Sequence, residues 1–214
     1  ESFELHVPHD EDARAARIRP GLDDKVLTEW NALFLSSLAQ AAAVFGRRDW
    51  LDAAIANGEF LLRELRGANG RWFRSWQADG TPRARHAALA ADHAALVDAF
   101  TRLAEATGEA RWINAAVATA ETMLEWFWDP DHGGLYTTAE DAEALVVRQK
   151  DIADGATPSA NSSAAIALFR LGDGREVTNT MWGTAPDGAA VRAFDYAYYT
   201  ESYDNRGVGF GPDG

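Results

Sequence analysis

The sequence predicts an all-α fold, an incomplete (α/α) toroid in which inner and outer helices alternate and short β-hairpins join the helix pairs. Five long segments carry apolar residues at helical spacing. The stretches WLDAAIA (50–56) and WINAAVA (112–118) align at a spacing of 62 residues, as do Gly46 and Gly108. This period exceeds that of common solenoid repeats, about 34 residues for tetratricopeptides. One repeat unit holds two helices and a turn-rich hairpin.

The first unit follows an arm, 1–20, that lacks apolar periodicity. A helix is expected over about 24–45, largely buried because its apolar arc is wide, with Gly46 ending it. Its apolar residues at helical spacing are Leu27, Trp30, Phe34, Leu38, Ala41 and Phe45. A second helix, about 48–66, ends at Gly67. GRWFRSWQADGT (70–81) alternates like a strand and contains the turn pair Asp79-Gly80, which predicts a β-hairpin.

The second unit repeats this plan, with helices expected over about 89–107 and 110–128 and short strands at HGGLYTT (132–138) and ALVVRQK (144–150). A fifth helix, about 158–171, begins a third unit. The toroid portion, 21–172, thus comprises about two and a half helical hairpins. The Gly-rich tail, 173–214, has no sustained helical period, so we expect loops there, with a short strand or helix near AFDYAYYT.

Composition excludes several classes of function. A net charge of −13 and a pI of about 4.7 disfavour nucleic acid and anionic membrane surfaces as partners. No apolar run reaches 18 residues, and there is no cysteine for a disulfide, a thiol nucleophile or a thiolate metal ligand. We expect a cytoplasmic protein without metal or cofactor. The start at Glu1, without an initiator Met, suggests a processed product or a fragment.

Polar clusters stand at the entrances of the first, third and fifth helices. These helices run parallel in a toroid, so their N-termini share one rim, where free N–H groups and carboxylates suit hydroxyl-rich ligands. The first cluster contains Asp23, Asp24, Lys25, Thr28 and Asn31; the second Asp92 and His93, with His86 upstream; the third Asp154, Ser159 and Asn161.

Each polar residue also has a structural interpretation. Asp23 or Asp24 can cap the first helix, and Thr157 can cap the fifth with Pro158 in its first turn. A buried Asn31 needs a hydrogen-bond partner and can tie the helix to a neighbouring loop. Histidines at helix entrances are more often structural than catalytic, which applies to His86 and His93.

Three segments together resemble the thioredoxin-domain-containing proteins related to spermatogenesis-associated protein 20. RPGLDDKVLTEWNALFLSSLAQA resembles their RP-x-LDDK-x-x-T-x-WNGLMI-x-ALA segment, and LAADHAALVDAFTRLAEATGEARW their LEDYAFLIDGLL-x-LYEAT segment. FWDPDHGGLYTTAEDAEALVVRQKDIADGATPSANSSAA is similar to their FWD-x-x-x-GGFF-x-T, R-x-K-D and DGATPSGNSVAA stretches. The resemblance covers about 19–171, with the motifs in the same order.

The resemblance implies a six-hairpin glycosidase-type toroid related to N-acylglucosamine 2-epimerases, preceded in the full-length family by a thioredoxin-like domain. That domain and any Cys-x-x-Cys are missing from this chain. Ala32 and Ala160 replace family glycines, and Ala91-Asp92-His93 stands for Glu-Asp-Tyr. The residues that match the motifs are Asp23, Asp24, Lys25, Trp30, Asn31, Asp92, Asp154, Pro158, Ser159 and Asn161.

Two functional hypotheses follow. The first is a carbohydrate-active domain, sugar epimerase-like or glycosidase-like, that binds a small sugar. Its expected catalytic residues are Asp24, Asp92 and His93, and its substrate-binding residues are Asp23, Lys25, Trp30, Asn31, His86, Asp154, Ser159 and Asn161. The second is a non-catalytic accessory or remnant domain, acting through homo-oligomerisation or association with a thioredoxin-like domain, because an open toroid exposes apolar faces.

Overall fold

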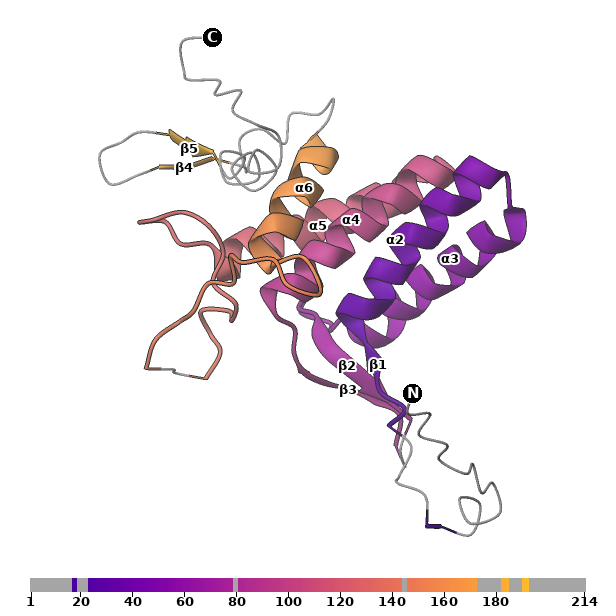
Figure 1. Cartoon of the computed structure of the whole chain (residues 1–214), viewed down its shortest axis with the longest axis horizontal. Helices are drawn as coiled ribbons and strands as arrows, with labels where there is room; N and C mark the ends of the chain where they lie inside the picture. Colours follow the sequence, from indigo (N-terminus) through magenta and orange to yellow (C-terminus); the bar gives the residue numbers. More distant parts are fainter. Residues whose placement is uncertain are drawn as a thin grey trace, which may run out of the picture.

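A computed structural model of the chain describes residues 17–18, 23–78, 81–143 and 146–172, with the backbone of 182–184 and 190–192. Five helices dominate: α2 (Thr28–Phe45), α3 (Arg48–Phe60), α4 (Ala90–Thr107), α5 (Ala110–Phe127) and α6 (Ala160–Gly172). α3 continues into one π-helical turn, η1 (Leu61–Leu65). In Figure 1, α4 lies between α2 and α6. Within the described part, no helix is long and apolar enough to cross a membrane.

The expected repeat of helix pairs is confirmed. Gly46 and Gly108 both end a helix in the left-handed conformation, with φ of 64° and 71°, and their N–H groups donate to Ala42 and Ala104 carbonyls. Two contacts show that α2 and α4 are parallel. The Glu29 amide at the start of α2 meets Asp92 at the start of α4, and further along Ser36 meets Asp98.

The core lies between the inner helices and the outer helices α3 and α5. The Trp112 ring of α5 stacks on Phe100 of α4 at a centroid distance of 5.9 Å. At Gly58 of α3, an added Cβ would lie 2.8 Å from Leu103 of α4 and 3.0 Å from the Trp112 ring. The absence of a side chain at Gly58 therefore lets α3 approach this pair closely.

The predicted hairpin forms, with β2 (Phe73–Gln77) antiparallel to β3 (Arg83–Ala87). Its turn pair, Asp79-Gly80, lies outside the described residues. The sequence did not predict β1 (Val26–Leu27), which pairs with β2 and replaces the first turn expected for the helix at 24–45. The sheet order is β1-β2-β3, and it lies at the N-terminal end of α2 (Figure 1).

The strands expected at 132–138 and 144–150 do not form among the residues described there. A single bridge joins Trp128 to Leu135, and the Thr137 amide donates to Gln149. Gly133 and Gly134 adopt φ of 70° and 76°, which interrupts an extended path. Of the arm 1–20, only residues 17–18 are described. The segment AFDYAYYT lies wholly outside the described residues. In the tail, β4 (Trp182–Thr184) pairs with β5 (Ala190–Arg192), an antiparallel ladder that was not expected.

The expected burial of the first helix is wrong for its largest side chains. Trp30 and Phe34 are 65% and 61% exposed, and Phe45 is also exposed. The buried residues of α2 are mostly small: Thr28, Ala32, Leu35, Ser36, Ala39 and Ala42. The apolar arc of α2 therefore covers both a packed face and an open one.

Candidate functional site

The cluster before α2 is exposed to solvent. Asp23, Asp24 and Lys25 are all exposed, and Lys25 Nζ lies 3.2 Å from an Asp23 carboxylate oxygen. Neither aspartate caps α2, because the residue before the helix is Leu27 and it makes no side-chain cap. Thr28 is buried, and its hydroxyl donates to the Phe73 carbonyl at 2.6 Å, which fixes the start of α2 to β2.

Trp30 and Asn31 point to different surroundings. The Trp30 ring is mostly exposed on the open side of α2. Asn31 Nδ2 donates to the Leu27 carbonyl at 2.8 Å, and the Asn31 carbonyl accepts a hydrogen bond from Asn57 Nδ2 at 3.3 Å. Asn31 therefore ties the start of α2 to α3, in agreement with the structural interpretation of this residue.

Asp92 joins the N-termini of two helices. The residue is 0% exposed, and one carboxylate oxygen accepts a hydrogen bond from the Glu29 amide at 3.1 Å. The other oxygen accepts the Leu89 amide at 2.8 Å and Arg74 of β2 at 3.1 Å. Burial raises the pKa of this carboxyl to about 6, against the opposing effects of the Leu89 hydrogen bond and the Arg74 charge. Asp92 thus supplies the cap for α2 that was expected from Asp23 or Asp24.

The two histidines are placed differently. His93 is 1% exposed, and its Nδ1 lies 2.8 Å from the Leu89 carbonyl oxygen. Its ring packs on the Phe127 ring of α5, with the ring centroids 4.8 Å apart. Burial lowers its pKa to about 4, so the ring is neutral at pH 7. Its Nε2 is buried without a hydrogen-bond partner. His86 is exposed on β3 with a φ of 60°.

The polar side chains before α6 also form hydrogen bonds with backbone groups. Asp154 Oδ1 accepts the Ser159 amide at 2.9 Å, which lowers the pKa of Asp154. Ser159, rather than the expected Thr157, caps the helix, because its hydroxyl accepts the Ser162 amide at 3.1 Å. The buried Asn161 accepts the Leu135 amide at 2.7 Å and donates to the Leu135 and Asp151 carbonyls at 2.9 and 2.8 Å.

The predicted site residues therefore divide into two groups. Asp23, Asp24, Lys25, Trp30 and His86 are exposed. Asp92, His93, Asn31, Asp154, Ser159 and Asn161 engage backbone groups. Asp92 and His93 present almost no surface to a ligand, and the His93 ring faces the outer helix α5. Their catalytic roles, like the other site assignments, stay predictions.

A polar cluster that sequence reasoning missed spans the three inner helices. Asp98 of α4 accepts a hydrogen bond from Ser36 of α2 at 2.5 Å and another from Arg102 Nε at 3.2 Å, and it pairs with Arg170 of α6. Asp98 lies two positions, or about 200°, from Phe100, which packs toward α5. The cluster therefore occupies the inner face of the helix layer. No periodicity signal distinguishes its residues from surface charges.

A second missed cluster organises the loop between α5 and α6. The buried Asp129 accepts hydrogen bonds from the Tyr136 hydroxyl at 2.9 Å and from the Asp131 and His132 amides at 3.0 and 3.2 Å, and its carboxylate lies 2.6 Å from Lys150 Nζ. Burial raises the pKa of Asp129, but the Lys150 contact and these hydrogen bonds outweigh it and hold the pKa below its usual range. Asp129 of the FWD motif therefore stabilises the loop that follows α5.

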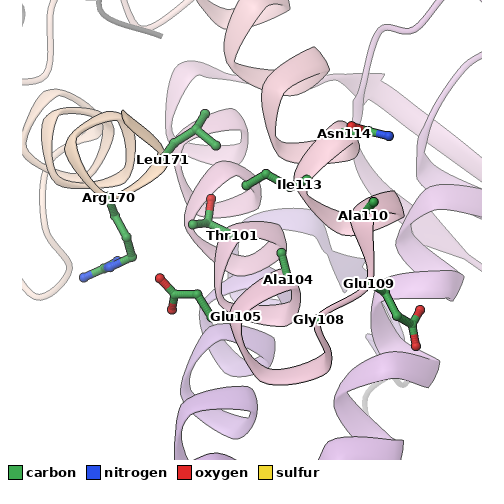
Figure 2. Close-up of a pocket in the computed structure, with 10 residues that line it drawn as sticks. All are labelled: Thr101, Ala104, Glu105, Gly108, Glu109, Ala110, Ile113, Asn114, Arg170 and Leu171. Carbon is green, nitrogen blue, oxygen red and sulfur yellow. The ribbon is translucent and has the colours of Figure 1, made fainter. Parts of the chain in front are cut away.

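One pocket of about 430 Å³ lies at the opposite end of α4 from Asp92. Figure 2 shows Ile113 and Leu171 pointing into it, with the Glu105 carboxylate directed to the side of Arg170 and Glu109 pointing away. It is therefore separate from the predicted rim. Within the described ranges, no group of three or more His, Asp or Glu side chains is arranged to hold a metal ion.

Sequence comparison finds relatives for most of the chain. It is 35% identical over 166 residues to human spermatogenesis-associated protein 20, covering 74% of this chain and 21% of that protein. It is 30% identical over 172 residues to an uncharacterised protein of Caenorhabditis elegans, covering 75% and 22%. The chain thus spans about a fifth of the length of these relatives. No protein-family model matches the sequence.

Structure comparison finds solved structures of an epimerase, a hydrolase and an isomerase that share the fold. The cellobiose 2-epimerase of Spirochaeta thermophila superposes with a TM-score of 0.58 at 22% identity, covering 78% of this chain and 48% of that one. The unsaturated glucuronyl hydrolase of Bacillus sp. GL1 superposes with a TM-score of 0.56 at 15% identity, covering 84% of this chain and 52% of that one. A D-mannose isomerase superposes with a TM-score of 0.58 at 16% identity, covering 73% of this chain and 39% of that one. The helical fold of this chain is therefore similar to part of the (α/α) toroid fold of these epimerases and glycosidases, and the match covers 39–52% of their chains.

Proposed function

Because this chain is a homologue of spermatogenesis-associated protein 20, we propose that it is the carbohydrate-binding portion of an (α/α) toroid. The observation that carries the proposal is the Asp98 cluster on the inner face, where three parallel helices contribute a hydroxyl, a carboxylate and two guanidinium groups. A carboxylate accepts hydrogen bonds from sugar hydroxyls, and an arginine donates hydrogen bonds to them, in defined directions. The epimerase and hydrolase fold supports this ligand class.

The exposed residues of the rim add secondary support to this proposal. Asp24 and Trp30 are exposed at the N-terminal end of α2, where a carboxylate can accept sugar hydroxyls and an indole can stack on a sugar face. Asp92 fixes the α2 and α4 termini relative to each other. In this arrangement Asp92 and His93 position the inner helices, and any acid–base chemistry belongs to groups that reach the inner face.

Thermal unfolding with a panel of mono- and disaccharides tests the proposal. A sugar present at 100 times its Kd stabilises the native state by about 2.7 kcal/mol. For a chain of this size that corresponds to a Tm increase of roughly 5–10 °C. Asp98→Asn should reduce the increase measured against its own sugar-free Tm, whereas Asp52→Asn, the same change on an exposed ion pair of α3, should preserve it. No increase with any sugar, or an equal increase in both variants, would contradict the proposal.

A second candidate function is that of an accessory domain that acts by association, including association with a thioredoxin-like domain. The open apolar side of α2, with Trp30 and Phe34, favours it. It predicts binding of a protein partner that Asp98→Asn leaves intact and that Phe34→Glu abolishes. A pull-down with a thioredoxin-like domain of a longer relative, compared between these two variants, separates the two functions.

A further inference from the structure

We infer that the Asp98 cluster, which consists of Ser36, Asp98, Arg102 and Arg170, selects a sugar that carries a carboxylate or a phosphate over the matching neutral sugar. This specificity rests on the proposed carbohydrate-binding function and belongs to the same site on the inner face. Two guanidinium groups meet one carboxylate there. Because arginine stays protonated in proteins, the cluster carries more positive charge than its own carboxylate neutralises.

The Asp98 carboxylate is already in contact with donors of the chain itself. Its Oδ2 accepts hydrogen bonds from the Ser36 hydroxyl at 2.5 Å and from Arg102 Nε at 3.2 Å, and its Oδ1 is paired with Arg170 Nη1. A sugar hydroxyl that donates to Asp98 has to compete with these contacts. Asp98 therefore acts chiefly by orienting the two guanidinium groups.

The two guanidinium groups keep donors for a ligand. A guanidinium carries several N–H donors, and among the contacts of the described residues Arg102 uses its Nε and Arg170 its Nη1. Their side chains are 18% and 27% exposed, so the remaining N–H groups are partly withdrawn from water and still reach the surface. Burial also lowers the pKa of Arg170. Such donors favour an anionic acceptor, because a hydrogen bond to an ionised group is about twice as strong as one to a neutral group.

Other charges of the described residues do not take the place of this anion. Glu105 follows Arg102 on α4 and is exposed, and Figure 2 shows its carboxylate on the side of Arg170. Among the ion pairs of the described ranges, none joins Glu105 to either arginine of the cluster. The net charge of −13 acts from further away, and at physiological ionic strength exposed charges beyond about 8 Å are largely screened. The nearby guanidinium groups therefore decide which sugar is preferred.

Isothermal titration calorimetry of the 214-residue chain at constant ionic strength tests this specificity. The probes are glucose, galactose and mannose, each as the neutral sugar, the uronate and the 6-phosphate. At least one acidic sugar should bind about 10- to 100-fold more tightly than its neutral counterpart, as for the gain of a hydrogen bond to a charged group. The uronate and phosphate arms distinguish the two anions. Acetate and inorganic phosphate should bind much more weakly, because they lack the sugar ring.

Substitutions of the two arginines assign the preference to the cluster. Arg102→Gln and Arg170→Gln each remove one charge and keep a donor, so each should lower the affinity for the acidic sugar by about tenfold and change the affinity for the neutral sugar little. Arg102→Lys retains the charge and should retain the preference for the acidic sugar. Arg48→Gln, the same change on an exposed ion pair of α3, should alter neither affinity. Circular dichroism checks that each variant keeps its helices.

The possible outcomes separate the specificity from the function on which it rests. A neutral sugar that binds as tightly as its acidic counterparts would overturn the specificity and leave the carbohydrate-binding function standing, as would an acidic preference that both glutamine variants retain in full. Acetate or inorganic phosphate binding as tightly as the acidic sugars would overturn it in favour of a simple anion site. The absence of binding by every probe would reject the carbohydrate-binding function, and the specificity with it.

Discussion

Asp92 and His93 are adjacent buried groups whose protonation should act on stability in opposite directions. On folding, the pKa of Asp92 rises from 3.8 to about 6 and that of His93 falls from 6.5 to about 4, both chiefly through burial. Each shift corresponds to about 3 kcal/mol of unfolding free energy. The Asp92 contribution is complete below pH 3.8 and is lost as pH rises through 6. The His93 contribution is complete above pH 6.5 and is lost as pH falls through 4.

The two contributions therefore nearly cancel in the wild-type chain between pH 4 and 6.5. Asp92→Asn removes the first, so stability should fall by about 3 kcal/mol as pH falls through this window. His93→Gln removes the second and keeps a donor for the Leu89 carbonyl, so stability should rise by a similar amount over the same window.

Urea unfolding, followed by tryptophan fluorescence at several pH values from 4 to 7, measures these slopes. The comparison uses the change of unfolding free energy with pH in each protein, because Asp92→Asn also lowers stability at every pH by placing an amide against the Leu89 N–H. Parallel pH profiles for the wild type and both variants would refute the reasoning. A slope of the wrong sign in either variant would show that the residue is not buried in the form described.

Three further predictions concern the loops and helix ends. Asn161→Ala should lower unfolding free energy by about 3 kcal/mol because it leaves buried Leu135 backbone groups without partners, whereas Asn114→Ala, at an exposed pocket residue, should change it little by the same urea titration. Gly108→Ala should cost about 1 kcal/mol from the left-handed φ alone, since an added Cβ meets no atom within 4 Å; differential scanning calorimetry should show the loss. Asp129→Asn should destabilise the chain at pH 7 and flatten the loss of stability that the wild type shows as pH falls below about 4, measured by circular dichroism melts.

The helices were predictable because their signals are local. Apolar spacing, the glycines at 46 and 108 and the 62-residue repeat all lie within short windows of sequence, and the structure places α2 to α5 close to the expected ranges. The first turn of the first helix was not predictable. Val26 and Leu27 fit a helix by pattern, but their backbone pairs with Trp76 and Ser75 of β2.

The candidate site was harder to predict because its contacts join distant segments. Asp92 caps α2 from a position 63 residues away, a contact that no local rule reveals. Asp98 looks like an ordinary surface charge until Ser36 and Arg170 are placed beside it. The expected burial of α2 was wrong for a related reason, since apolar spacing cannot distinguish the face of α2 that packs on α4 from the face that is exposed.

The most direct test of the carbohydrate-binding proposal is residue-resolved mapping of the bound sugar. Nitrogen-15 NMR of the labelled chain, titrated with the sugar that gives the largest Tm increase, would locate the contact. The proposal predicts shifts concentrated at Ser36, Asp98 and Arg102 on the inner face, and their loss in Asp98→Asn. Shifts concentrated at Ile113 and Asn114, on the α5 side of the pocket at the C-terminal end of α4, or saturating changes that Asp98→Asn leaves intact, would contradict it.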